Sequence, residues 1–339
     1  DEPTAVLTPQ ETEKLFNVLR KMRDDGKAIV IITHKMHEVE SLSDRVAVLR
    51  NGQYIGSMLT KDTTVTEMTN MMVGHAVTLN IVRPEPVNPK PRIEVQGLTV
   101  RNEEGIVKLK DVSFTANSGE ILGIAGISGC GQKELLEAIA GLQVTETGTI
   151  SYVEDDGSKE MLIGKDPLKI AEMGVSLSFV PEDRLGMGLV GNMDLTDNMM
   201  LRSFRKGKTP FVNRKPSRKL AESVVKDLAV VTPGITTPVR RLSGGNVQKV
   251  LLGREIASSP TVLLTAYAVR GLDINSSYTI YDLLNEQKKK GVAVIFVGED
   301  LDVLVELSDR IMVLCGGQVS GIVDARTTDK NEVGMMMTR

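Results

Sequence analysis

Two glycine-containing segments of this sequence combine residue types and spacing that suit a phosphate group. Leu242-Ser243-Gly244-Gly245-Asn246 directly precedes an apolar run with helical spacing. The first N–H groups of a helix have no partner within the helix and lie at its positive end, so they favour an anion. Glycine lets the backbone approach such a ligand closely, and Ser243 adds a hydroxyl donor. A simple capped turn has the same local pattern, so other motifs must decide between the two interpretations.

The second segment runs from Gly126 through Gly129 and Gly131 to Gln132 and Lys133. It follows an apolar run predicted to be a strand and precedes a predicted helix, which is the setting of a phosphate-binding loop. Against the pattern G-x-x-x-x-G-K-[ST], Gln132 replaces the lysine and Lys133 replaces the hydroxyl that ligates Mg²⁺. A lost charge-assisted hydrogen bond costs roughly 1.5–3 kcal/mol. Lys133 could reach the phosphates itself, but we expect this loop not to support hydrolysis.

Acidic residues and a histidine near the start form a third candidate group. The sequence opens on Asp1 and Glu2, and the apolar run 28–33 reads as a parallel strand, buried on both faces, that ends at His34. Ligands of open α/β sheets bind at the carboxyl ends of strands. Carboxylates there can hold Mg²⁺ and polarise an attacking water. Alone, the histidine is better interpreted as an ordinary residue at a strand end.

An internal repeat organises these elements. A shift of 265 residues aligns Gly26 with Gly291 and Asp44 with Asp309, and several further pairs match without a gap. Residues 1–74 are therefore interpreted as the C-terminal part of one domain, and residues 92–339 as a second, complete copy. Residues 75–91 contain four closely spaced prolines and are predicted to be an extended, semi-rigid linker.

The same offset shows what the second copy lacks. Asp1 and Glu2 correspond to Ala266 and Tyr267, and His34 corresponds to Glu299. A carboxylate facing a terminal phosphate would repel it, and no acid remains to polarise water. The second copy should therefore not hydrolyse a nucleotide at its own loop.

Composition restricts the remaining function classes. The 339 residues carry a net charge of -3, which gives no electrostatic reason to expect nucleic acid as a partner. Two cysteines, Cys130 and Cys315, imply no disulfide framework. No apolar run reaches the roughly 18 residues of a membrane span. The start on Asp1 rather than methionine suggests a fragment.

The motifs together resemble those of ABC-type ATPases. Leu242 to Asn246 is similar to the family signature L-S-G-G-Q, and Asp1-Glu2-Pro3-Thr4 resembles the D-E-P-T end of its Walker B strand. The resemblance implies an α/β P-loop NTPase fold, as one complete and one partial ABC-type nucleotide-binding domain. A mostly parallel sheet with an antiparallel β-subdomain and a helical subdomain is expected. It also implies that Asp1 holds Mg²⁺, Glu2 polarises water and His34 contacts the γ-phosphate.

In this family each ATP site is composite, with one domain's phosphate loop facing the other domain's signature. By resemblance, Asp1, Glu2 and His34 of the first domain would share a working site with Ser243, Gly244, Gly245 and Asn246 of the second. The degenerate site at Gly126, Gly129, Gly131, Gln132 and Lys133 would be structural or bind nucleotide without turnover. The first domain's phosphate loop should precede residue 1, so the chain alone is expected to be inactive.

Further segments are similar to one subfamily. Pro181-Glu182-Asp183-Arg184 and Arg270-Gly271-Leu272-Asp273 resemble the second domain of fused ATPases from bacterial simple-sugar and nucleoside importers. This implies ATP and Mg²⁺ as cofactors, two transmembrane permease subunits and an extracytoplasmic solute-binding protein as partners, and a peripheral position on the cytoplasmic face of the inner membrane. The alternatives are a soluble ABC ATPase acting on ribosomes or nucleic acid, and a non-catalytic regulatory half.

Overall fold

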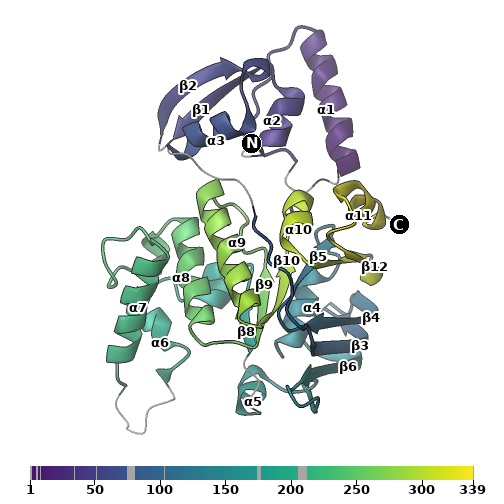
Figure 1. The fold of residues 1–339 in the computed structure, drawn as a ribbon, viewed down its shortest axis with the longest axis vertical. Helices are drawn as coiled ribbons and strands as arrows, with labels where there is room; N and C mark the ends of the chain where they lie inside the picture. Colours follow the sequence, from purple (N-terminus) through teal and green to yellow (C-terminus); the bar gives the residue numbers. More distant parts are fainter. Residues whose placement is uncertain are drawn as a thin grey trace. The chain divides into compact units, whose positions relative to one another are not determined.

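The computed structural model describes two compact units. Residues 2–4, 7, 9–33, 35–50, 52–74, 81–102, 104–173, 177–204 and 212–338 are described. The small unit is Asp1–Ile81 with Asp273–Tyr278, and the large unit is Val82–Leu272 with Thr279–Arg339 (Figure 1). Two of the predicted site residues, Asp1 and His34, lie outside the described residues.

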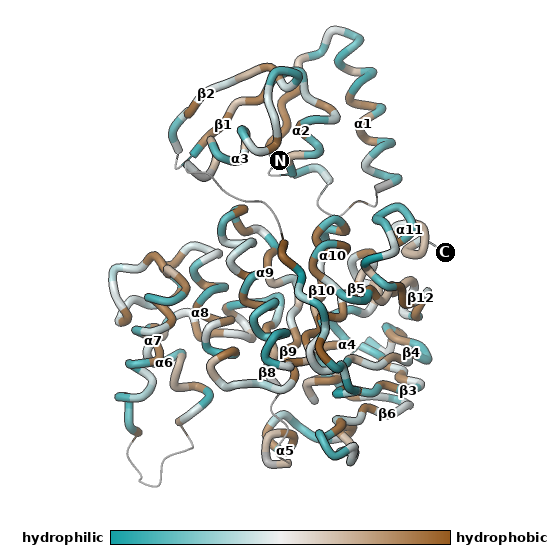
Figure 2. Tube along the Cα trace, in the orientation of Figure 1, coloured by the Kyte–Doolittle hydropathy of each residue, from teal (hydrophilic) through white to brown (hydrophobic). Residues whose placement is uncertain are grey.

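A six-stranded sheet forms the centre of the large unit. Its strand order is β12-β11-β5-β10-β9-β8, in which β12 is antiparallel to β11 and all other neighbours are parallel. The strands are β5 (Ile121–Gly126), β8 (Leu177–Val180), β9 (Val262–Ala266), β10 (Ala293–Val297), β11 (Arg310–Cys315) and β12 (Gln318–Asp324). Every residue of β9 and β10 is buried, as expected for parallel strands covered on both faces. Both strands are hydrophobic in Figure 2.

An antiparallel sheet packs beside the central one. Its order is β4-β3-β6-β7, formed by β3 (Pro91–Arg101), β4 (Val107–Asn117), β6 (Thr145–Val153) and β7 (Lys159–Met161). Side chains of both sheets and of helix α4 (Gln132–Ile139) share one apolar core. Burial of such side chains contributes roughly 1.5–3 kcal/mol each, so this core fixes the position of α4 against the sheets.

Helices complete the large unit. Three of them, α6, α7 and α8, gather beyond the β8 edge of the central sheet, and α8 contacts β8 (Figure 1). The helices are α5 (Pro167–Glu172), α6 (Leu195–Met200), α7 (Lys215–Asp227), α8 (Gly244–Ile256), α9 (Ile274–Lys289), α10 (Leu301–Leu307) and α11 (Lys330–Met336). None of the helices in the described part of the chain is long and apolar enough to cross a membrane.

The described part of residues 9–74 in the small unit forms three α-helices and a hairpin. Helices α1 (Pro9–Asp24) and α2 (Met36–Leu42) precede strands β1 (Arg45–Arg50) and β2 (Gln53–Leu59), and helix α3 (Val65–Val73) follows. Thr64 and Glu67 form a capping box at the start of α3. Met68 is fully buried against Met36 and Val39, which packs α3 onto α2.

The 265-residue repeat recurs in the structure. Helices α1 and α2 start 265 residues before α9 and α10, and strands β1 and β2 start 265 residues before β11 and β12. Even the irregularity in the ladder recurs, between Val48 and Leu49 in β1 and between Val313 and Leu314 in β11. The two segments therefore follow the same structural plan, element by element.

One predicted strand is absent. The run 28–33 was expected to be a strand buried on both faces, yet it is not a strand, and Val30 and Ile32 are 90% and 63% exposed. A strand requires neighbours for its N–H and C=O groups. Its counterpart β10 lies between β9 and β5, whereas β1–β2 is the one ladder among the described residues of the small unit. Of the run's backbone, Ile32 accepts a hydrogen bond from the Glu2 N–H, at 2.8 Å.

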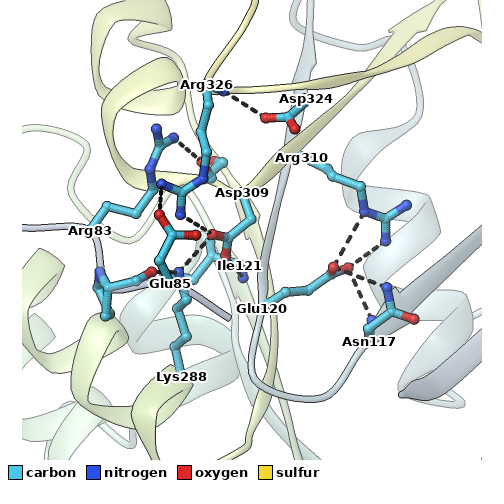
Figure 3. A network of polar contacts seen from close by, with 12 residues as sticks. Arg83, Glu85, Asn117, Glu120, Ile121, Lys288, Asp309, Arg310, Asp324 and Arg326 are labelled. Carbon is cyan, nitrogen blue, oxygen red and sulfur yellow. Dashed lines mark hydrogen bonds and ion pairs between the residues drawn. The ribbon is translucent and has the colours of Figure 1, made fainter. Parts of the chain in front are cut away.

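The C-terminal part of the proline-rich segment lies on the large unit (Figure 3). Arg83 Nη1 donates to the Val305 carbonyl at 2.9 Å and also to the Ser308 carbonyl. Glu85 pairs with Arg326 at 2.5 Å. Residues 81–90 are therefore held by side-chain contacts, although the structure assigns them no helix or strand.

A buried ion pair supports this attachment. Lys288 Nζ donates to the Pro84 carbonyl and lies 2.7 Å from the Asp309 carboxylate. Asp309 also accepts the N–H of Ile121, at 2.8 Å, at the start of β5. The same two side chains thus connect α9, β5 and the proline-rich segment (Figure 3).

Candidate functional site

The predicted glycine loop joins a strand to a helix. Strand β5 ends at Gly126 and helix α4 begins at Gln132. Gly131 caps the helix with φ 98°, and a Cβ on it would lie 2.5 Å from the Lys108 carbonyl oxygen. A side chain is therefore excluded at Gly131 by both conformation and space. The loop has the backbone of a phosphate-binding loop.

The side chains of the loop do not suit a phosphate. Gln132 is 2% exposed, and its Nε2 donates to the Ile127 carbonyl at 3.1 Å. The same amide lies against Gly126, where a Cβ would come within 2.5 Å of Nε2. Lys133 lies 3.7 Å from Glu137, in the next helical turn. A neutral amide thus bonds inside the loop, and the neighbouring ammonium pairs with a carboxylate of its own helix.

The positions that follow β9 form a network of their own. The Tyr267 N–H donates to the Val297 carbonyl at 3.0 Å, and the Arg270 guanidinium lies 5.8 Å from the centre of the Tyr267 ring. Arg270 pairs with Glu299 at 3.0 Å and also with Glu182. Burial raises the pKa of Tyr267 to about 12, and the charges of Glu182 and Glu299 act in the same direction.

A cavity of about 270 Å³ lies between Lys133 of α4, Glu182 and the end of β9. It is lined by Lys133, Glu137, Phe179, Pro181, Glu182, Asp183, Met187 and Ala266. Burial raises the pKa of Glu137, against the opposing effect of Lys133. Three carboxylates and one ammonium make a poor environment for a polyphosphate. In the described ranges, no cluster of three His, Cys, Asp or Glu residues could hold a metal ion. The lining of this cavity therefore does not suit the negative charge of ATP.

The second glycine segment has a different character. Helix α8 begins at Gly244, and Ser243 is its N-cap without a side-chain capping bond. Asn246 Nδ2 donates to Ser243 Oγ at 2.8 Å, and Asn246 Oδ1 accepts the Val231 N–H at 2.9 Å. Because its oxygen accepts from Asn246, the Ser243 hydroxyl can donate its proton outward. Ser243 and Gly244 are exposed and Gly245 is buried.

This segment fits an anion. The N–H groups of the first turn of α8 have no intrahelical acceptor, since the ladder of this helix starts with the Val247 N–H bonding the Ser243 carbonyl. Three donors and a hydroxyl therefore converge at the positive end of a 13-residue helix. Asn246, which replaces the glutamine of the pattern, orients the serine.

The acidic candidates lie in the small unit. Glu2 is partly buried, and its backbone has the unusual φ of 41°. Nearby, Thr4 donates to the buried Glu38, which also lies 3.5 Å from Lys35. The neighbours of Glu2 are thus held by a polar network between the chain start and α2. The roles assigned to Asp1, Glu2 and His34 stay predictions.

Sequence reasoning did not identify the contacts made by Arg184 and Arg270. Both residues belong to segments that were singled out, but their partners are 86 and 88 positions away in the sequence: Arg184 donates to the Arg270 carbonyl, and Arg270 pairs with Glu182. The sequence did hold one signal of these contacts: Glu299 stands where a histidine was expected. A carboxylate in such a site needs a basic partner, which indicates a nearby arginine or lysine.

Comparisons with known proteins agree with this geometry. The family model described as "ABC transporter" matches residues 109–265. The chain is 36% identical to the glucose import ATP-binding protein TsgD13 of Haloferax volcanii and 36% identical to the nucleoside import ATP-binding protein NupA of Lactococcus lactis. The two alignments include 100% and 99% of this chain. They span 61% of the length of TsgD13 and 66% of the length of NupA.

Solved structures are similar as well. A dimeric bacterial ABC transporter cassette, MJ0796, is 25% identical with a TM-score of 0.59, and the match covers 70% of this chain and 100% of that chain. A nucleotide-free ATP-binding cassette from an ABC transporter, at 18% identity, has a TM-score of 0.58 over 74% of this chain and 96% of that one.

Proposed function

This chain carries the ATP-binding domain of the ABC transporter family, and we propose that it is part of the ATP-hydrolysing subunit of a bacterial importer for a simple sugar or a nucleoside. The family and the predicted fold are confirmed. A mostly parallel sheet, an antiparallel β-subdomain and a helical subdomain are all present, and solved ABC cassettes have the same fold.

One contrast within the large unit carries the proposal. The signature turn Ser243–Gly245 has outward donors, whereas the glycine loop of the same unit is closed by Gln132, and Glu182 lines the cavity beside Lys133. The large unit thus supplies a signature but no working phosphate loop, as expected if it forms one half of a site that two domains share. We infer that its nucleotide is bound mainly by another domain.

The proposed second half is the domain whose end is residues 1–74. Its elements α1, α2, β1 and β2 stand at the same 265-residue offset from α9, α10, β11 and β12, which supports two copies of one domain. In this proposal, residues 75–91 link the copies, and residues 92–339 are the second, degenerate copy.

Each residue then has a defined role in the productive site. Glu2 accepts a proton from the attacking water, His34 contacts the γ-phosphate, and the Ser243 hydroxyl with the Gly244 and Gly245 N–H groups donates to the same phosphate. Asp1 would hold Mg²⁺, which neutralises phosphate charge when bound. Negative charge that develops on the phosphate is stabilised by donors fixed before the reaction.

The partners and location follow from the same proposal. Relatives named as glucose and nucleoside import ATP-binding proteins support a role at the cytoplasmic face of the membrane. The subunit would contact two permease subunits there, and a solute-binding protein would deliver the sugar or nucleoside from outside. Nucleotide-driven closure of the two domains would transmit the work of hydrolysis to the permease.

The decisive experiment uses the full-length protein with its permease subunits in membranes. ATP turnover is measured for Glu2→Gln and Ser243→Arg, with Gln132→Ala as the control. We expect both variants to lose turnover by about 100-fold or more, because each removes an interaction with the reacting centre, while the control keeps it. Wild-type turnover in Glu2→Gln and Ser243→Arg would contradict the proposal and favour a non-catalytic regulatory half.

A further inference from the structure

We propose that Arg184 is a positioning residue for the signature turn, and that the remnants of the second ATP site serve as its support. The inference rests on the proposed function, since it concerns the composite site to which Ser243 contributes. It assigns a role to the charges that make the second site unfit for nucleotide.

Arg184 lies between two loops of the large unit. Its Nη1 is 3.3 Å from the position that a Cβ on Gly244 would occupy, so the guanidinium lies beside the first residue of α8. Its other terminal nitrogen, Nη2, donates to the Arg270 carbonyl. One planar side chain therefore spans the signature turn and the turn that follows β9.

The backbone that carries Arg184 is anchored at several points. It begins a π-helical turn, Arg184–Gly188, in which the Asp183 carboxylate accepts the Gly186 N–H at 2.7 Å. At the other end, buried Arg254 of α8 donates to the Gly188 carbonyl at 2.7 Å. A Cβ on Gly188 would meet Leu251 of the same helix at 2.8 Å. The turn thus runs along α8, which fixes the place of Arg184 at the helix start.

Arg270 is held in turn by the altered site. Glu182 and Glu299 both pair with its guanidinium, and the Tyr267 ring lies beside it. The route of contact is continuous from Glu299 through Arg270 and Arg184 to Gly244. A carboxylate at position 299, unsuitable beside a phosphate, is suitable as an anchor for this arginine.

The surroundings of Arg184 disfavour its charge, so specific contacts are needed to keep the side chain in place. Burial lowers the pKa of Arg184, and the nearby charge of Arg270 lowers it further, opposed by Glu182. An arginine without anchoring contacts would turn into solvent, because hydration favours its charge. Its position therefore depends on the Arg270 carbonyl and on the packed turn.

The expected consequence concerns the rate of the chemical step. The signature donors act on the γ-phosphate only when the turn presents Ser243 correctly, and small displacements of positioned groups cost up to about 100-fold in rate. Loss of Arg184 should therefore lower kcat at the productive site. The KM for ATP should change little, because the other domain binds most of the nucleotide.

The test measures kcat and KM for ATP in the full-length protein with its permease subunits. We expect Arg184→Met to lower kcat by about 10-fold or more, with KM within about twofold and an unchanged melting temperature. Arg184→Lys should restore part of kcat, since an ammonium can still donate to the Arg270 carbonyl. The control is Arg218→Met, at a position of α7 whose side chain is 68% exposed, and it should match wild type.

A second variant keeps the test decisive if Arg184→Met folds poorly. Glu299→Gln leaves Arg184 in place but weakens its support, and it should lower kcat in the same direction without a change in KM. If Arg184→Met and Glu299→Gln keep wild-type kcat while Glu2→Gln loses turnover, this inference fails and the proposed function stands. If Glu2→Gln keeps full turnover, the proposed function itself fails.

Discussion

Lys288 Nζ lies 2.7 Å from the Asp309 carboxylate, and the two side chains are 1% and 6% exposed. Burial lowers the pKa of Lys288, and the pairing with Asp309 opposes that effect. The pair joins the end of α9 to the start of β11, and Lys288 also bonds the proline-rich segment through the Pro84 carbonyl. A buried charge in this position depends on its partner.

The first prediction follows from that dependence. Asp309→Asn leaves the Lys288 ammonium buried without a counter-charge and should lower the free energy of unfolding by about 3–5 kcal/mol. Equilibrium urea unfolding of the chain measures this change. Glu286→Gln removes the exposed pair with Lys289 on the same helix and serves as the control, with no change expected. Equal stability of the two variants would contradict the buried pairing.

A second prediction concerns alkaline pH. Because the folded pKa of Tyr267 is about 12 and its ordinary value is 10, the folded protein keeps a proton that the unfolded chain has released in between. The contribution of protonated Tyr267 to the free energy of unfolding is therefore present in full below pH 10. It is lost as the pH rises through 12. Tyr267→Phe should therefore reduce the fall in unfolding free energy over this interval. Tyr54→Phe, at an exposed position, should leave it as in the wild type.

A third prediction tests whether the closed loop can be repaired. Gln132→Lys with Lys133→Ser restores the G-x-x-x-x-G-K-[ST] pattern, but Glu182, Arg270 and Glu299 remain in the site. We expect fluorescent ATP analogues to show no gain in affinity at this loop. Adding Glu299→His should raise affinity, since it removes a carboxylate that repels phosphate. A gain from the first two changes alone would show that the loop, rather than the acidic surroundings, limits binding.

A fourth prediction compares two glycines with similar backbone angles. Gly148 has φ 96° and Gly157 has φ 86°, but a Cβ on Gly148 would lie 2.5 Å from the Gly97 carbonyl oxygen, whereas the space around Gly157 is open. Gly157→Ala should cost about 1–2 kcal/mol, from conformation alone. Gly148→Ala adds a clash with the β3 backbone and should cost about 3 kcal/mol or more. Urea unfolding should separate the two, and similar losses would refute the steric argument.

Local pattern predicted much of this fold. The loop between β5 and α4, the start of α8 at Gly244 and the repeat of hairpin and helices all depend on residues near one another in the sequence. Glycine positions and apolar spacing determine such features, because they act through the backbone of the same segment.

Other features depend on distant partners and were not predictable. The run 28–33 has the composition of a buried strand, yet burial requires neighbouring strands, which composition does not supply. Likewise, Arg270 meets Glu182 because the parallel strands β8 and β9, which precede them, are neighbours in the sheet. Arg184 lies beside Gly244 because the turn Arg184–Gly188 packs along α8. In the sequence these residues belong to separate motifs, and residue type alone does not predict that the motifs are in contact.

Among the strands that the structure describes, the hairpin of the small unit pairs with no third strand. Strand β11 bonds β12 on one side and β5 on the other, whereas β1 pairs with β2 alone among the strands that the structure describes. A row of available N–H and C=O groups templates pairing with a foreign strand. Concentrated preparations of this chain should accordingly form oligomers by adding strands at β1, and a supplied peptide with the sequence of β5 should suppress that growth.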